Sequence, residues 1–325
     1  MNLQKKSSPL ISVIMSAYNS EKYIAEAIES ILNQTFRNFE FIIFDDGSTD
    51  RTKQIIQKYA KLDKRIIAIH NNKNIGYKGF IKNLNKGIKI ARGKYLARMD
   101  ADDISLPKRL ETQYQFLETN PTIFLVASSF FYINIKGIVI GRKIIQTKSE
   151  DIKDKIVKSG LIVHPTVLFR NDGSAKYREK VFYCEDLDLW LRLISMNKNL
   201  AVLPSILLKY RIHETQIGIS KKIIQREIIN NVLKWHEERK RGNKDSYNKF
   251  NLRKLKSFNN QSDIKEIDYL KLKFLFRENK IRQFKREAQL FFKTNGLFYN
   301  KRIAILYIMS MLPKKIRVIF EYLFW

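Results

Sequence analysis

The chain of 325 residues is long enough for one large domain or for a domain with an appendage. Its hydrophobic content of 44%, with 21 Phe and 15 Tyr, supplies a substantial core and excludes a disordered chain. The formal net charge of +29 favours anionic partners such as nucleic acid or lipid headgroups, and the single cysteine, Cys184, excludes an internal disulfide framework.

Residues 1–9 are polar and lack the apolar core of a signal peptide. No window approaches the roughly 18 uninterrupted apolar residues that a membrane-spanning helix needs. A single cysteine also suits a reducing compartment. These features together predict a cytoplasmic protein.

Strands and helices alternate in the first 70 residues. A buried strand is predicted at 10–15, and Ser20 is a suitable N-cap for the helix that follows. A second apolar strand at 39–44, a helix at 51–61 and a third strand at 66–70 continue the pattern. Strand and helix in alternation are typical of an α/β fold in which crossover helices join parallel strands.

The predicted strand at 95–99 ends in three carboxylates, Asp100, Asp102 and Asp103. Side chains two apart on an extended segment point the same way, so Asp100 and Asp102 converge. Mg²⁺ or Mn²⁺ prefers such oxygen ligands and bridges phosphates. The alternative interpretation is a solvated acidic turn.

A second acidic turn, Asp45 and Asp46, follows the strand at 39–44. Parallel strands place both turns at one edge of the sheet, where ligands of open α/β sheets bind. Neither GxGxxG nor GxxxxGK[ST] occurs in the chain. Carboxylates and a metal, rather than a glycine-rich loop, would therefore hold a bound nucleotide.

The elements expected between residues 105 and 212 continue the α/β pattern. They are a helix at 105–120, a strand at 123–131 with a hairpin turn at Lys136 and Gly137, a short polar helix at 149–159, a turn at His164 leading into a strand, a helix from Glu185, and strands at 200–203 and 206–212. In the helix from Glu185, Leu187, Trp190 and Leu191 lie at helical spacing and are expected in the core.

The pattern changes after residue 220. Residues 221–325 hold 26 Lys and Arg against 10 Asp and Glu, in predicted helices with clustered aromatic residues near the C-terminus. Basic and aromatic residues together suit a helix lying on an anionic membrane. The alternative is a helical tail that packs on its own domain or on a second copy of the chain.

Four ordered segments, 11–19, Asp45 to Asp50, 91–95 and Asp100 to Asp103, resemble family 2 glycosyltransferases. The resemblance covers about residues 10–215 and implies a GT-A fold, a mixed and mostly parallel sheet flanked by helices. The predicted organisation is a tail at 1–9, a catalytic domain at 10–220 and a helical basic region at 221–325. The resemblance further implies inverting transfer from a nucleotide diphosphate sugar, usually a UDP-sugar, with Mn²⁺ or Mg²⁺.

Matching positions carry over one by one. The resemblance implies nucleotide contacts by Ser16, Ala17 and Tyr18, a base contact by Asp46, a ribose neighbour in Asp100 and a metal ligand in Asp102. The spacing from Asn74 to Asn85 is longer than is usual in the family.

Glu185 and Asp186 resemble the Glu-Asp motif of the family, in which the aspartate is the general base and the glutamate positions the acceptor. The acceptor hydroxyl must lose its proton as it attacks the anomeric carbon. A purely structural role is the alternative, because carboxylates stabilise the first turn of a helix. The segment from Tyr210 resembles a Tyr-Arg-x-His motif and implies a phosphate contact for Arg211 and a metal or phosphate contact for His213.

The sequence thus predicts an inverting, metal-dependent glycosyltransferase of bacterial surface polysaccharide biosynthesis. Its acceptor would be a glycan or an undecaprenyl-linked glycan, and the enzyme would lie at the inner face of the cytoplasmic membrane. An anionic membrane surface is an expected partner, nucleic acid is not, and the oligomeric state is left open.

Two alternatives remain open. A nucleotidyltransferase usually has a glycine-rich, basic loop after the first strand, unlike residues 16–19. A polyanion-binding protein would leave Asp102 and Asp186 without a role.

Overall fold

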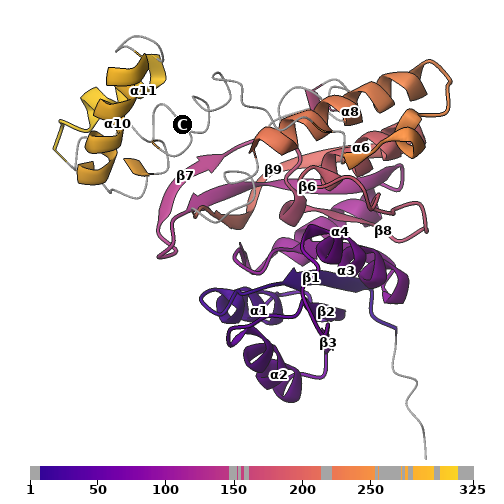
Figure 1. Cartoon of the computed structure of the whole chain (residues 1–325). Coiled ribbons are helices and arrows are strands. Elements are labelled where there is room, and N and C mark those ends of the chain that lie inside the picture. Colours follow the sequence, from indigo (N-terminus) through magenta and orange to yellow (C-terminus); the bar gives the residue numbers. More distant parts are fainter. Residues whose placement is uncertain are drawn as a thin grey trace, which may run out of the picture. The chain divides into compact units, whose positions relative to one another are not determined.

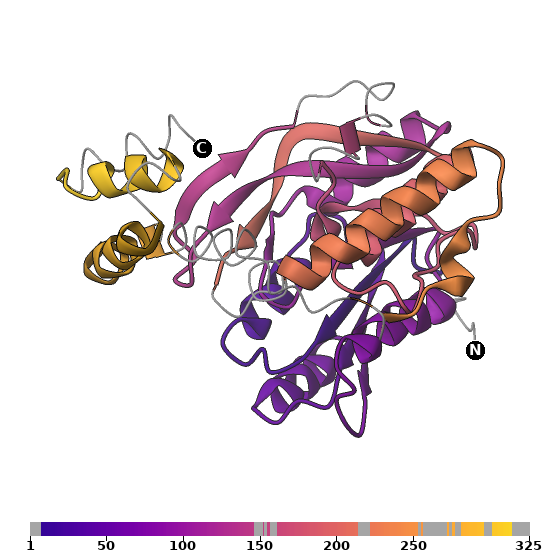
Figure 2. The same cartoon turned by 45° about the horizontal axis from the view of Figure 1, so that its top comes forward.

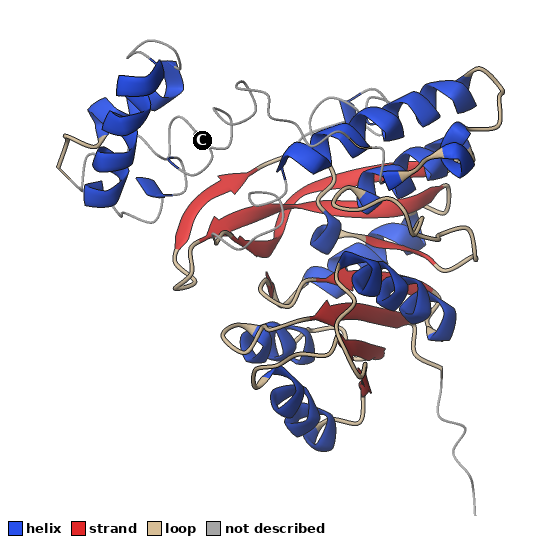
Figure 3. Cartoon of the chain, viewed as in Figure 1, coloured by secondary structure: helices blue, strands red, loops and turns tan. Residues whose placement is uncertain are grey.

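The structure is a computed structural model that describes residues 8–145, 152, 155–156, 161–213, 222–252, 255, 272, 275–276, 281–295 and 301–313. Figure 3 draws the other residues in grey. The predicted polar helix at 149–159, apart from three positions, and the aromatic C-terminus lie outside the described residues.

Two compact units make up the chain. We call Met1–Phe130, Ile144–Tyr210 and Ile228–Leu252 the sheet unit, and Phe131–Lys143, Arg211–Glu227 and Arg253–Trp325 the terminal unit. The predicted domain boundary at residue 220 stays a prediction.

Four parallel strands form the first half of the sheet. They are β1 (Ile11–Ala17), β2 (Phe39–Asp45), β3 (Ile66–His70) and β4 (Tyr95–Met99), in the order β3-β2-β1-β4. The apolar runs of β1, β2 and β4 are buried on both faces, as expected for parallel strands covered by helices, whereas β3 at the sheet edge is only partly buried. The predicted strands are confirmed, with β1 and β2 each extending further toward their carboxyl ends.

Helices α1 (Ile24–Leu32), α2 (Thr52–Leu62) and α3 (Tyr77–Ile90) connect these strands (Figure 1). Each buries one face, because its apolar residues recur at helical spacing. The predicted side-chain cap at Ser20 is wrong: α1 begins at Ile24, and the Ser20 carbonyl accepts hydrogen bonds from the Tyr23 and Ile24 N–H groups. A turn therefore precedes the helix and replaces the cap.

Three strand pairs in the second half of the sheet are antiparallel. β8 (Leu168–Arg170) pairs antiparallel with both β4 and β6 (Ile123–Ile133), and β9 (Asn199–Arg211) pairs antiparallel with β5 (Ile104–Ser105). The full order is β3-β2-β1-β4-β8-β6-β9-β5, and Figure 2 shows β6 and β9 side by side as long curved strands. This mixed sheet with flanking helices confirms the expected fold class.

Strand β9 corrects one prediction. The sequence predicted two strands, at 200–203 and 206–212, but a single strand of 13 residues runs through Pro204. The proline is exposed, and a strand accommodates proline where the missing N–H is not needed for pairing. The predicted hairpin is confirmed: β7 (Val139–Lys143) pairs with β6, and Gly137 N–H donates to the Asn134 carbonyl (2.9 Å).

The remaining described elements are α4 (Arg109–Thr119), η1 (His164–Thr166), α6 (Glu185–Ser195), α8 (Lys222–Lys240), η2 (Ser246–Lys249), α10 (Ile281–Asn295) and α11 (Lys301–Met309). They confirm that the region after residue 220 is helical. Within the described ranges, no helix is both long and apolar enough to span a bilayer.

Helix α8 lies alongside α6 in the sheet unit (Figure 1), where Arg239 Nε donates to Ser195 Oγ at 3.0 Å. Trp235 is fully buried, with its ring edge-on to Phe250 at 5.1 Å. Asp245 forms ion pairs with both Arg178 and Arg239. These contacts hold α6, and with it Glu185 and Asp186, against the rest of the sheet unit.

We predict that Gly93→Ala destabilises the sheet unit by roughly 1–3 kcal/mol. A Cβ at Gly93 would lie 2.5 Å from Ser12 N and 2.7 Å from Ile11 C, so the backbone entering β4 would have to move away from β1. Urea unfolding of both proteins measures the change.

Gly141→Ala is the matched control, because the nearest atom to its added Cβ, Tyr132 Cδ2, is at 3.7 Å, an ordinary contact. We expect that variant to stay within about 0.5 kcal/mol of the parent. Equal midpoints for the two variants would show that the approach of Gly93 to β1 is not a constraint.

Candidate functional site

The candidate site lies where the parallel strands end. β1 pairs with β2 as far as Ala17 opposite Asp45, and with β4 as far as Met15 opposite Met99. All three strands run the same way, so the residues after them leave the sheet at one edge. The predicted convergence of the two acidic turns is therefore confirmed.

Asp46 is buried, and both of its carboxylate oxygens accept hydrogen bonds. Asn71 Nδ2 donates to Oδ1 at 2.7 Å and Asn74 Nδ2 donates to Oδ2 at 3.0 Å. Asn71 also donates to Asn83 Oδ1 (2.9 Å), and Asn83 Nδ2 donates to Ser16 Oγ (3.0 Å). A chain of hydrogen bonds thus joins Ser16 to Asp46, two residues that the sequence singled out separately.

The three asparagines were not identified as a set from the sequence. Asn83 lies between the buried Ile81 and Leu84 of α3, and a polar residue among the buried positions of an amphipathic helix is a usable signal. Asn71 follows directly on β3, at the same sheet edge as the acidic turns. Its position after a parallel strand was the other available indication.

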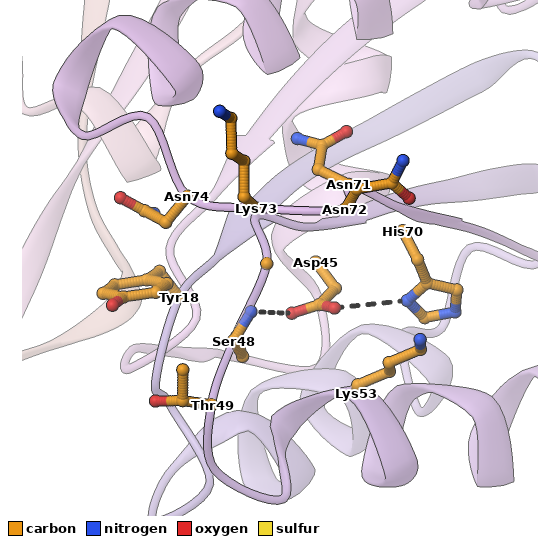
Figure 4. A pocket seen from close by; sticks show the side chains of 11 residues that line it. Tyr18, Asp45, Ser48, Thr49, Lys53, His70, Asn71, Asn72, Lys73 and Asn74 are labelled. Atoms are coloured by element: carbon orange, nitrogen blue, oxygen red, sulfur yellow. Dashed lines mark hydrogen bonds and ion pairs between the residues drawn. The ribbon is translucent and has the colours of Figure 1, made fainter.

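A pocket of about 460 Å³ opens beside these residues (Figure 4). Figure 4 shows Tyr18 and Asn74 on one side of it and His70 and Lys53 on the other. Asp45 lies between them, accepting from the Ser48 N–H (3.1 Å) and pairing with His70 Nδ1 (3.4 Å). The full lining is Tyr18, Asp45, Gly47, Ser48, Thr49, Lys53, His70, Asn71, Asn72, Lys73 and Asn74.

Gly47 allows two main-chain segments to approach closely at one wall of this pocket. Its φ of +70° lies in the left-handed region, and an added Cβ would be 2.4 Å from the main-chain carbon of Lys73. Residues 47 and 73 can approach this closely only because position 47 has no side chain. The glycine of the Asp-Asp-Gly turn therefore allows the turn after β2 to approach the segment after β3.

Asp100, Asp102 and Asp103 form an acidic cluster after β4, with one carboxylate oxygen of each lying within 4.8 Å of the others. Asp103, which the sequence did not select as a site residue, is buried, whereas Asp100 and Asp102 are partly exposed. Three oxygen ligands so close together fit a hard divalent cation such as Mg²⁺ or Mn²⁺.

Two buried arginines lie beside this cluster. Arg98 Nη2 pairs with Asp100 Oδ1 at 2.5 Å, and its guanidinium lies 5.3 Å from the ring centre of Phe80. Arg109 donates to the main-chain carbonyls of Arg98 (2.7 Å) and Val167 (3.2 Å). Burial lowers the pKa of Arg109 to about 9, against the opposing effect of Asp103. Both side chains are cations at neutral pH and offset the acidic cluster.

Glu185 and Asp186 occupy the first turn of α6, as predicted. Glu185 is buried, with Oε2 accepting from the Tyr77 hydroxyl (2.6 Å) and Oε1 lying 3.5 Å from His164 Nδ1. Asp186 is half-buried, and its Oδ1 accepts from the Leu187 N–H (2.7 Å). The two carboxyl groups therefore differ: Glu185 is held by side chains, whereas Asp186 is held by the main-chain N–H of Leu187.

The pKa values of both carboxyl groups are raised. Burial raises the pKa of Glu185 to about 7, against the hydrogen bond from Tyr77, which lowers it. Burial, followed by the Glu185 charge, raises the pKa of Asp186 to about 6. An aspartate with this pKa is ionised at neutral pH and accepts a proton more readily than an exposed one.

Arg98 and Asp100 also act on Glu185. The Arg98 charge lowers the pKa of Glu185 and the Asp100 charge raises it, after the larger effects of burial and hydrogen bonding. Burial, followed by Arg98, lowers the pKa of His164 to about 4, so this imidazole is neutral. The acidic cluster and the carboxyl pair thus belong to one electrostatic site.

Arg211 and His213 belong to the terminal unit. Arg211 is buried, and its Nη1 donates to the Asn134 carbonyl (3.0 Å) in the turn between β6 and β7. His213 is half-buried two residues beyond. Their implied contacts with phosphate or metal stay predictions.

Residues 12–182 match the model of glycosyl transferase family 2. An uncharacterized glycosyltransferase of Methanocaldococcus jannaschii is 40% identical over 238 residues, 72% of this chain and 81% of that protein. The UDP-Glc:alpha-D-GlcNAc-diphosphoundecaprenol beta-1,3-glucosyltransferase of Escherichia coli is 33% identical over 227 residues, 69% of this chain and 86% of that protein.

Solved structures show the same fold. Residues 1–349 of S. aureus TarS, in complex with UDP-GlcNAc, give a TM-score of 0.55 at 19% identity, and the match covers 92% of this chain and 90% of that one. The mannosyltransferase of Pyrobaculum calidifontis in complex with GDP-Man and Mn²⁺ has a TM-score of 0.54 at 14% identity, covering 98% and 88%. The chain therefore belongs to glycosyl transferase family 2 and is a glycosyltransferase with the GT-A fold.

Proposed function

We propose that the enzyme transfers a sugar from a UDP-sugar, with inversion, to a glycan or lipid-linked glycan acceptor in surface polysaccharide biosynthesis. The observation that carries this proposal is that the acidic cluster after β4 lies near enough to the carboxyl pair of α6 for the Asp100 charge to raise the pKa of Glu185. Asp100, Asp102 and Asp103 suit a cation, and Glu185 and Asp186 suit a proton acceptor. Family membership favours this activity over a nucleotidyltransferase and over a non-catalytic polyanion-binding protein.

The donor nucleotide would lie between Tyr18 and the Asp46 network. The 460 Å³ pocket is within the range of small-ligand sites, and Tyr18 offers an exposed ring for stacking on a base. Asp46, held by Asn71 and Asn74, presents a fixed acceptor to a base N–H. Ser16 and Ala17 end β1 beside it, and the E. coli relative named above uses UDP-Glc.

Asp102, with Asp100 and Asp103, would hold Mg²⁺ or Mn²⁺. Such an ion, when bound, neutralises charge on the diphosphate as it departs. Asp100 would remain paired with Arg98, and Asp100 and Asp102 are both partly exposed. We also propose Arg211 as a phosphate contact and His213 as a metal or phosphate contact, roles that the family motif implies for them.

Asp186 would act as the general base. The acceptor oxygen forms a bond to the anomeric carbon while the bond from that carbon to the diphosphate oxygen breaks on the opposite side, which inverts the configuration. The acceptor proton passes to the Asp186 carboxylate. Glu185 would shape the acceptor side through its contacts with Tyr77 and His164.

A lipid-linked acceptor is supported by the E. coli relative, whose name includes a diphosphoundecaprenol acceptor. The region after residue 220 carries 26 Lys and Arg against 10 Asp and Glu. A basic surface of this kind is attracted to anionic headgroups. We therefore place the enzyme at the inner face of the cytoplasmic membrane, where such an acceptor is presented.

We predict that Asp102→Asn lowers Mn²⁺-dependent release of UDP from UDP-glucose or UDP-N-acetylglucosamine by about 100-fold or more. The substitution removes one anionic ligand from the acidic cluster. Release is measured with Mn²⁺, with Mg²⁺ and after chelation. The matched control is Asp172→Asn, which removes an exposed aspartate paired with Lys198, and it should keep the parent rate. Equal rates for both variants would contradict the proposal.

We predict that kcat/KM for UDP release falls about tenfold per pH unit below about pH 6. Asp186, whose pKa is raised to about 6, must be ionised to accept the proton, so activity is lost as the carboxyl group protonates.

In Asp186→Asn we expect turnover to drop by about 10²–10⁴-fold with donor binding retained. Donor affinity is measured separately by calorimetry. A pH profile that stays flat down to pH 5 in the parent enzyme would exclude Asp186 as the base.

A further inference from the structure

Helix α3 touches both sides of the proposed site. On the donor side, a Cβ at Gly79 would lie 2.7 Å from Asp46 Oδ2, and Asn83 donates to Ser16 Oγ. On the acceptor side, the Tyr77 hydroxyl donates to Glu185 Oε2 at 2.6 Å. One rigid helix therefore spans the distance between the nucleotide contacts and the carboxyl pair.

The Tyr77 ring is fixed by other aromatic rings. Its centre lies 5.0 Å from that of Phe80, 5.7 Å from that of Phe182 and 4.5 Å from that of Tyr183. Tyr183 has a φ of +65°, which is costly for a residue with a side chain and persists only where packing imposes it. The Tyr77 ring thus packs on the strained residue that leads into α6.

Glu185 has little freedom to contact a substrate. It is buried, and its two carboxylate oxygens face the Tyr77 hydroxyl and the His164 ring. His164 Nε2 in turn lies 2.7 Å from the Tyr177 hydroxyl, and the Tyr177 main chain exchanges two hydrogen bonds with Asn85 of α3. The surroundings of Glu185 are therefore attached to α3 at two places, Tyr77 and Asn85.

We propose that Tyr77 is a positioning residue, whose hydroxyl holds Glu185 and thereby orients the first turn of α6 so that Asp186 faces the bound donor. The inference rests on the proposed function, in which Asp186 is the base. Tyr77 acts through Glu185 and touches neither donor nor acceptor. Because α3 also contacts Asp46 and Ser16, the base keeps a constant position relative to the nucleotide.

Tyr77→Phe tests this role, because it removes the hydroxyl and keeps the ring. We expect kcat for Mn²⁺-dependent release of UDP from UDP-glucose or UDP-N-acetylglucosamine to fall roughly ten- to 100-fold, with the donor KM unchanged. The matched control is Tyr59→Phe, which removes another tyrosine hydroxyl bonded to a glutamate, Glu29, between α1 and α2. That variant should keep the parent kcat.

A double-mutant cycle with Glu185→Ala, which removes the acceptor of the Tyr77 hydroxyl, identifies the route of the effect. If Tyr77 acts through Glu185, adding Tyr77→Phe to Glu185→Ala causes little further loss of kcat. Additive losses would overturn the proposal, as would a raised donor KM with unchanged kcat, which would place Tyr77 at the donor. A parent-like kcat in Tyr77→Phe would also overturn it.

Carbon-detected NMR titration of the Glu185 carboxyl group reads the contact without any substrate. The Tyr77 hydrogen bond lowers the pKa of Glu185, so Tyr77→Phe should raise that pKa above its parent value, near 7. An unchanged pKa overturns the proposal even if kcat falls, because a general structural defect would then explain the loss. The parent enzyme could fail to cleave any nucleotide sugar while Tyr77→Phe still raises the pKa of Glu185. That result would overturn the proposed function and the positioning role, but it would establish the contact between Tyr77 and Glu185.

Discussion

The parallel pairing of β1 between β2 and β4 is the constraint on which the site depends. It brings the ends of three strands to one edge, where Asp46 and the acidic cluster Asp100, Asp102 and Asp103 leave the sheet. An antiparallel neighbour would have sent one of these turns to the opposite edge. The antiparallel strand β8 pairs with the far side of β4, so it does not separate the strands whose ends carry the acidic turns.

Gathering carboxylates at one edge creates repulsion, and the fold offsets it with buried cations. Arg98 pairs directly with Asp100, and Arg109 binds the main chain of β4 and the segment before β8. Arginine suits this place because it stays protonated when buried, even where burial lowers its pKa as for Arg109. The cations lie in the core next to the carboxylates and reduce the repulsion among them.

The carboxyl pair of α6 shows which of two opposing effects dominates. The N-terminus of a helix favours the ionised form of a carboxyl group and lowers its pKa. Burial has the opposite effect, and it is the largest influence on the pKa values of Glu185 and Asp186, exceeding the main-chain hydrogen bonds that lower them. Tyr77 then restrains Glu185, the more deeply buried of the two. The pKa values of about 7 for Glu185 and about 6 for Asp186 result from this balance.

The sequence by itself determined the strands, the crossover helices, the two acidic turns and the carboxyl pair at the start of α6. These features follow from local periodicity and from short motifs, which depend only on residues that are close together in the sequence. Tertiary structure alone decided the continuity of β9 through Pro204, the asparagine chain from Asp46 to Ser16, and the contact of Tyr77 with Glu185. Tyr77 and Glu185 are 108 residues apart, and no local pattern specifies which distant side chains meet once the sheet and its helices pack.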